Sequence, residues 1–140
     1  MPEPTRSPFS YAILRVVPRV ERGEQFNAGV VLFCRQRGFL DARVALDEAR
    51  LRALAPDTPA DEVRAHLEAL ARVARGDPEC GPIATLPQSE RFGWLVAPSS
   101  TIIQPSEVHT GLSEDPQATL DALFAELVEP VAPDADGAAR

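Results

Sequence analysis

The mostly apolar segment that predicts a strand at residues 28–35 constrains the fold more than any other part of the sequence. Its centre reads Val-Val-Leu-Phe-Cys, an unbroken stretch of β-branched and large apolar residues. Such a stretch predicts a strand buried on both faces, as in the centre of a sheet. The chain therefore has to supply this strand with neighbours.

Two further runs are suited to that position. Residues 9–17 are rich in aromatic and β-branched residues, and Pro18 ends this run because proline cannot donate to a strand ladder. Residues 39–46 follow the central run after only Gln36-Arg37-Gly38, a spacing typical of a hairpin. The three runs together predict an antiparallel meander.

Helix signals occupy the middle and the end of the chain. Asp47 predicts a cap for a short helix over residues 48–55, and Thr58-Pro59 predicts the N-cap and first residue of a helix that ends near Arg75, before Gly76. Asp115-Pro116 predicts the start of a last helix. Its apolar residues recur at helical spacing: Leu120, Leu123, Phe124, Leu127 and Val128.

These elements predict an α+β fold. We expect a mostly antiparallel sheet, built from the N-terminal three-stranded meander and short later strands, with helices packed on one face. The later strands are expected at residues 92–97, 101–104 and 108–110, in edge positions because prolines interrupt them. Residues 9–130 are predicted as a single domain, residues 1–8 as a flexible lead-in and residues 131–140 as a disordered tail.

Charge and composition exclude several classes of protein. All 14 basic residues are arginine, and the net charge is −7, which argues against a general polyanion binder and makes nucleic acid an unfavoured partner. Residues 1–43 nevertheless carry +3, against −10 for residues 44–140. Neither a membrane span nor a signal peptide is apparent, so we expect a cytoplasmic protein with no membrane partner, in which Cys34 and Cys80 are free thiols.

The residues that could carry catalysis are few. None of the common nucleotide, hydrolase or metal motifs is present, so no cofactor and no metal are expected. His109 lies among hydroxyls in a segment that ends at Gly111, a setting that suits a general base. A structural histidine bonded to a turn is the alternative and the favoured interpretation.

Two other polar segments are candidate binding sites. Residues 22–29 lie immediately before and within the central strand, and residues 91–94 combine with the hydroxyl-rich residues 99–101. The full set of candidate ligand- or partner-binding residues is Arg22, Glu24, Asn27, Gly29, Arg91, Trp94, Ser100, Thr101, Gln104, Ser106, His109 and Thr110.

The order and spacing of these motifs resemble an uncharacterised bacterial family, catalogued as domain of unknown function 3037. Its recurring E-x-x-N-x-G-V-V-L and S-x-V-H-T-G segments correspond here to residues 24–32 and 106–111, with Glu107 where proline is common. The resemblance covers roughly residues 9–129. Genes of that family often lie next to a gene for a HipA-like kinase. The resemblance therefore implies a protein partner, but no particular chemistry.

Two functions from different classes remain open. The first is a non-enzymatic interaction or modulator protein, with a HipA-like kinase as a possible partner. The second is a small enzyme or anionic-ligand binder with a polar site around His109 and the Glu24–Asn27 segment. The second requires residues 22–29 and 91–110 to converge in one concave site.

Overall fold

The computed structural model describes residues 5–130 of the chain. It confirms the α+β fold, with about 42% helix and 26% strand. The five strands are β1 (Ser7–Val16), β2 (Phe26–Cys34), β3 (Phe39–Val44), β4 (Ile103–Pro105) and β5 (His109–Ser113). The helices are α1 (Glu48–Leu54), α2 (Ala60–Arg75), α3 (Gln88–Leu95) and α4 (Pro116–Leu127), with short 3₁₀ turns at Arg35–Arg37, Pro78–Cys80 and Pro82–Thr85.

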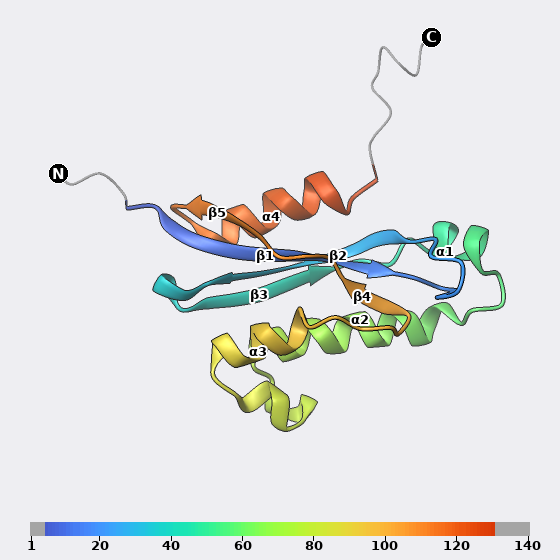
Figure 1. The fold of residues 1–140 in the computed structure, drawn as a ribbon, viewed down its shortest axis with the longest axis horizontal. Coiled ribbons are helices and arrows are strands. Elements are labelled where there is room, and N and C mark those ends of the chain that lie inside the picture. The colour runs from blue at the N-terminus through green and yellow to red at the C-terminus, as the bar shows by residue number, and fades with distance from the viewer. Residues whose placement is uncertain (1–4, 131–140) are drawn as a thin grey trace, which may run out of the picture.

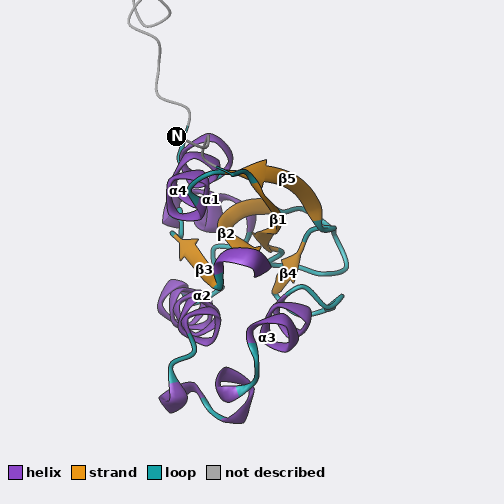
Figure 2. Ribbon diagram, turned by 90° about the vertical axis from the view of Figure 1, so that its left-hand side faces the viewer, coloured by secondary structure: helices purple, strands orange, loops and turns teal. Residues whose placement is uncertain are grey.

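All strand pairs of the sheet are antiparallel, and the strand order is β3-β2-β1-β4, with β5 also paired to β1. The meander predicted for the first three strands is confirmed. Val30, Val31, Leu32 and Cys34 of β2 are completely buried, as expected of a central strand. β4 and β5 follow each other along the outer edge of β1, so both occupy edge positions (Figure 2).

Helices cover both faces of the sheet, which corrects the expectation that they would pack on one face. α2 and α3 lie on one side and α4 lies on the other (Figure 1). The alternation of side chains along β2 is the reason: Val31 packs in the cluster under α2 and α3, whereas Val30 and Leu32 pack against Leu120 and Phe124 of α4. A strand that is apolar on both sides needs two covering layers.

A β-bulge interrupts the pairing of β1 with β2. Leu14 pairs with Gly29 and Arg15 with Asn27, so that Ala28 is the extra residue. Because the bulge reverses the alternation of side chains on β2, Asn27 lies on the α4 face of the sheet, whereas an uninterrupted strand would turn it toward α2. The side chain of Asn27 is thereby placed at the end of α4.

Several expected elements differ from the structure. Residues 92–97 do not form a strand, because α3 spans Gln88–Leu95 and buries Phe92 and Leu95 one helical turn apart. Thr58 is not the N-cap of α2: that position is Pro59, and the Thr58 N–H donates to Ala55 O of the preceding turn. β1 begins at Ser7 because Ser7 and Pro8 pair with the end of β5. The tail predicted for residues 131–140, and residues 1–4 of the lead-in, lie outside the described residues.

Other local expectations are confirmed. Asp47 caps α1 by accepting from the Arg50 N–H, and Asp115 caps α4 by accepting from the Ala118 N–H. Gly76 ends α2 in the left-handed conformation, with φ of 79°. Within residues 5–130, both cysteines are free thiols.

None of the helices described here is long and apolar enough to cross a membrane.

Candidate functional site

Ser106 lies at the point where β1 changes partner from β4 to β5. Its side chain is buried, and its Oγ accepts from the Ile13 N–H at 2.8 Å while donating to Glu107 O. The Ser106 N–H donates in turn to Ile13 O. The serine therefore supplies the hydrogen bonds that a continuous strand would make here, and both its hydroxyl and its amide serve the sheet.

Asn27 and Gly29 also serve the fold. The Asn27 Nδ2 donates to Leu127 O at the end of α4, at 2.9 Å, and the Asn27 Oδ1 accepts from Arg15 Nε at 3.4 Å. A Cβ on Gly29 would lie 2.8 Å from Val44 Cγ1 and 2.9 Å from Arg43 O. The glycine thus allows β2 and β3 to approach closely beside the bulge.

Arg91 joins α3 to the end of α2. Its guanidinium donates to Leu86 O at 2.7 Å and to Ala74 O at 3.3 Å, and its buried Nε has no acceptor within residues 5–130. The partly buried side chain also closes over Gly76, where a Cβ would lie 3.4 Å from Arg91 Nη2. These contacts occupy the guanidinium on the α2 and α3 side of the sheet, away from Asn27.

His109 belongs to β5, where it pairs with Tyr11 of β1. Its ring stacks on the Tyr11 ring with centroids 5.2 Å apart, and Tyr11 in turn stacks on Phe9 at 6.1 Å. Within the described residues the imidazole has no hydrogen bond to a carboxylate or hydroxyl that would orient it for proton transfer. Thr110, the next residue, is exposed.

The polar candidates do not converge. Glu24 is in the β1–β2 turn, where it forms an exposed ion pair with Arg22 that raises the pKa of that arginine. His109 and Asn27 lie on the same face of the sheet, but they pair with residues of β1 four positions apart, about 13 Å along the strand. Arg91 lies on the opposite face. The polar site required for a small enzyme or anionic-ligand binder is therefore not assembled.

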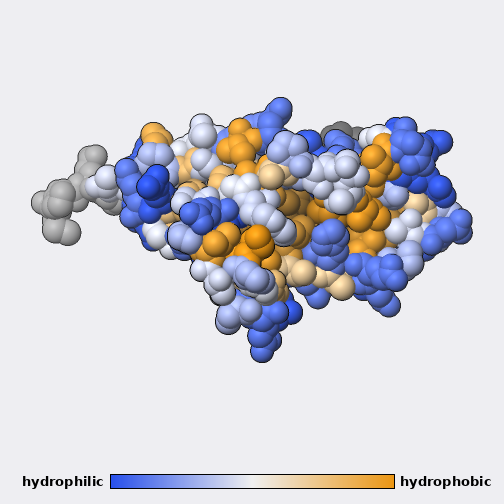
Figure 3. Space-filling model, turned by 60° about the horizontal axis from the view of Figure 1, so that its bottom comes forward, coloured by the Kyte–Doolittle hydropathy of each residue, from blue (hydrophilic) through white to orange (hydrophobic). Residues whose placement is uncertain are grey.

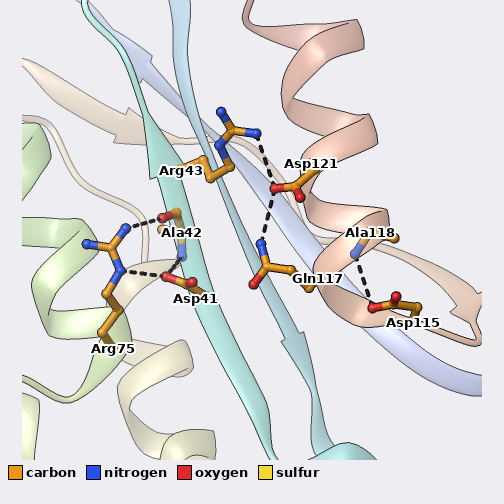
Figure 4. A network of polar contacts seen from close by, with 8 residues as sticks. All are labelled: Asp41, Ala42, Arg43, Arg75, Asp115, Gln117, Ala118 and Asp121. Carbon is orange, nitrogen blue, oxygen red and sulfur yellow. Dashed lines mark hydrogen bonds and ion pairs between the residues drawn. The ribbon is translucent and has the colours of Figure 1, made fainter.

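The arginines of the first third are largely engaged within the protein. Figure 4 shows two of the contacts that hold β3 between the helices. Arg43 donates to Asp121 of α4 at 3.1 Å and lies over the Phe124 ring, and Arg75 of α2 donates to Asp41 at 2.9 Å. Of the arginines at residues 1–43, Arg43 joins two layers of the fold, and Arg15, Arg22 and Arg37 donate hydrogen bonds elsewhere within the protein.

The structure assembles a different site, an apolar cleft between α2, α3 and β4, with a volume of about 310 Å³. Hydrophobic residues gather on this face of the molecule around a hollow (Figure 3). Trp94 is the only tryptophan of the chain, and its side chain on the cleft wall is 46% exposed. The cleft is lined by Leu14, His66, Leu70, Trp94, Leu95, Ala97, Pro98, Ser99, Thr101, Ile103 and Pro105.

Two of the predicted site residues, Trp94 and Thr101, belong to this cleft. Thr101 Oγ1 donates to Ile103 O at 3.0 Å, and Gln104 Nε2 donates to Thr101 O at 2.9 Å, so both side chains shape the loop that forms the rim. Ser100 is exposed on the same loop. His66 of α2, which is exposed, also lines the cleft. The sequence signal for the cleft was the pairing of residues 91–94 with the hydroxyl-rich residues 99–101, which include Trp94 and Thr101.

The lining of the cleft is mostly apolar, and its polar groups are few. It contains one imidazole and two hydroxyls, and no carboxylate or guanidinium lines it. Among residues 5–130, no group of three or more His, Cys, Asp or Glu side chains is arranged to hold a metal ion. This chemistry suits the burial of an apolar group of a ligand or partner.

An antiparallel α+β domain with an apolar cleft beside its outer strands is the class that the fold and the site define. Comparison with models of protein families identifies the family of the chain. A family model described as protein of unknown function (DUF3037) matches residues 11–128, and the chain belongs to this family. No curated protein and no solved structure matches the chain.

Proposed function

We propose that this chain is a non-enzymatic interaction domain whose cleft receives an apolar side chain of a partner protein. The observation that carries the proposal is the position of Trp94, which is half-exposed on the wall of an open apolar cleft. Large exposed aromatic residues beside a pocket are typical of the residues that dominate binding energy at protein interfaces.

The use of the polar candidates supports the same proposal. The hydrogen bonds of these residues stabilise the fold: Ser106 bonds the main chain of β1, Asn27 bonds the end of α4, and Arg91 connects α3 to α2. They are not available to orient a substrate. A binding domain needs only a shaped surface, and the cleft supplies one.

We further propose a HipA-like kinase as the partner and the bacterial cytoplasm as the place of binding. The motif resemblance supports this choice of partner, because it implies a protein neighbour of the HipA-like type. In this proposal the chain acts as a modulator that contacts the kinase through the Trp94 cleft.

The test is a binding titration between the purified chain and a HipA-like kinase encoded beside it. We expect a stable complex, and we expect Trp94→Ala to weaken it about tenfold or more because the substitution removes a central anchoring contact. Val20→Ala is the matched control, since Val20 is also an exposed large apolar residue (45%) but lies in the β1–β2 turn, away from the cleft. Absence of a complex would contradict the kinase as partner, and equal binding by both variants would contradict the cleft as docking site.

A further inference from the structure

We propose that the outer edge of β5 is a strand-addition site, which accepts an extended segment of a partner that carries basic side chains. This inference extends the proposed function, because it supposes a protein partner and specifies how part of it binds. It depends on a different surface from the Trp94 cleft, and the two can fail separately.

The two outer edges of the sheet are protected to different degrees. β3 forms one edge, and side chains bond its outward main chain: Ala42 N–H donates to Asp41 Oδ1 at 2.7 Å, and Ala42 O accepts from Arg75 Nη2 at 3.1 Å (Figure 4). The carbonyl of Gly38, just before β3, accepts from Gln88 Nε2 at 2.8 Å. Such contacts prevent another strand from pairing with β3.

β5 has no corresponding protection among the described residues. The main-chain groups of Ile13 point toward the β5 side of β1, since they bond with Ser106. Because these groups alternate in direction along a strand, Tyr11 and Phe9 also face β5, and their partners His109 and Gly111 point inward. The N–H and C=O groups of Thr110 and Leu112 therefore point outward, and no contact within residues 5–130 occupies them.

The side chains at this edge are unusually apolar for an unpaired strand. Leu112 is 61% exposed and Val108 is 43% exposed, and Thr110 lies between them. Phe9 covers Gly111 from the neighbouring strand, with ring atoms 2.6 and 2.8 Å from where a Cβ would stand, so the ring can pack directly on the β5 backbone. An exposed edge of this kind is a template for pairing with an added strand.

The charges around β5 select the partner. An open groove of about 540 Å³ separates β5 from α4, and its charged residues are three acids, Glu114, Asp115 and Glu126, and one base, Arg6. Glu107 is exposed at the other end of the strand. An added strand that places arginine or lysine side chains beside these carboxylates gains favourable electrostatic contacts.

The same charges disfavour one of the registers in which a second copy of this chain could occupy the edge. Antiparallel self-pairing about Gly111 would pair Thr110 of one protomer with Leu112 of its partner, and this register has outward main-chain groups on both sides. It would also set Glu107 opposite Asp115 of the other copy, and like charges directly opposite each other destabilise a strand pair. A foreign basic strand avoids this repulsion.

The experiment uses amide hydrogen exchange of the full chain, with a short capped peptide in which valine alternates with arginine as the probe. We expect the probe to slow exchange at Thr110 and Leu112 several-fold, and to do so less at high salt. The matched peptide with glutamate in place of arginine should leave these amides unchanged. Unchanged exchange with the basic probe, or slowed exchange elsewhere only, would overturn the proposal, and so would concentration-dependent protection in the protein alone, which would assign the edge to self-pairing.

Two variants separate main-chain pairing from a general loss of structure. Leu112→Pro removes an outward N–H that has no partner within the described fold, so the domain should still fold and the response to the probe should be lost. Leu112→Thr retains the N–H and should keep the response. Glu114→Arg reverses an exposed charge, which forms a long ion pair with Arg6 at 3.9 Å, and it should weaken binding of the basic probe. A kinase complex that survives Leu112→Pro undiminished would contradict this inference and leave the Trp94 cleft intact as docking site.

Discussion

At the scale of single residues, the atoms around a glycine decide whether a larger residue could replace it. Gly29 is the clearest case. A Cβ added there would clash with Arg43 O, which is a backbone atom and cannot move aside without disturbing the β2–β3 pairing. Gly93 of α3 is different, since nothing lies within 4 Å of the position of its missing Cβ.

This contrast gives a paired prediction. Gly29→Ala should destabilise the fold by about 1–3 kcal/mol through overpacking. Gly93→Ala should leave stability unchanged or raise it by up to about 1 kcal/mol, since alanine is the better helix former and the position is open. Urea unfolding of both variants measures the difference, and equal stabilities would contradict the close approach of β2 and β3 at Gly29.

Asp77 provides a prediction with pH. Its carboxylate accepts hydrogen bonds from the Arg72 side chain and from the Glu79 N–H. These bonds, the Arg72 bond most strongly, lower the pKa of Asp77 below its ordinary value of 3.8. Because the pKa of Asp77 is lower in the folded than in the unfolded state, the contact stabilises the fold fully at a pH above the unfolded pKa. This stabilisation is lost as the pH falls through the folded pKa. Asp77→Asn should therefore reduce the Tm at neutral pH, and the difference from the wild type should shrink as the pH falls below 3.8.

Thermal unfolding across the pH range measures this effect. Asp57→Asn is the control, because Asp57 is exposed in the turn between α1 and α2 and makes no side-chain hydrogen bond within residues 5–130. A difference between Asp77→Asn and the wild type that stays constant down to the most acid pH would exclude the Arg72 contact as its source.

At the scale of elements, the outer edge of β1 is shared by two short strands with a gap between them. Ser106 fills that gap by bonding the main chain of Ile13 in both directions. Removal of its hydroxyl leaves a buried N–H without an acceptor, and such a loss is more costly than that of an exposed hydrogen bond.

Ser106→Ala should therefore destabilise the protein by about 1–3 kcal/mol. Ser100→Ala should have little effect, because Ser100 is exposed and its hydroxyl makes no hydrogen bond within the described residues. Chemical unfolding compares the two, and exchange of the Ile13 amide should be faster in Ser106→Ala alone. An unchanged Ile13 amide would show that the serine does not hold the sheet together.

At the scale of the whole molecule, the sheet is covered by α4 on one side and by α2 with α3 on the other (Figure 1). The Trp94 cleft and the free β5 edge occur along the same side of β1, the side on which β4 and β5 pair with it. The surfaces proposed for binding therefore lie on one edge of the sheet.

Trp94 allows this to be followed in solution. As the only tryptophan, and 46% exposed, it should emit at long wavelength and be accessible to acrylamide in the free protein. Binding at the cleft removes water from the indole and should shift the emission to shorter wavelength. A complex that leaves both emission and quenching unchanged would place the partner elsewhere on the molecule.

Local patterns accounted for much of the fold. The three first strands, the caps Asp47 and Asp115 and the end of α2 at Gly76 follow from apolar runs and capping residues that act over a few positions. α3 did not follow, because an eight-residue helix offers too few turns for its period to be distinguished from that of a short strand.

The central strand follows from the sequence alone, because the five consecutive apolar residues at 30–34 favour burial on both faces of a sheet. The tertiary structure alone decided which polar residues meet. A bulge at Ala28 turned Asn27 toward α4, and the choice of face separated Arg91 from both Asn27 and His109. Proximity between distant segments depends on strand register and on the layer each helix joins, and neither is encoded in the spacing of residues along one segment.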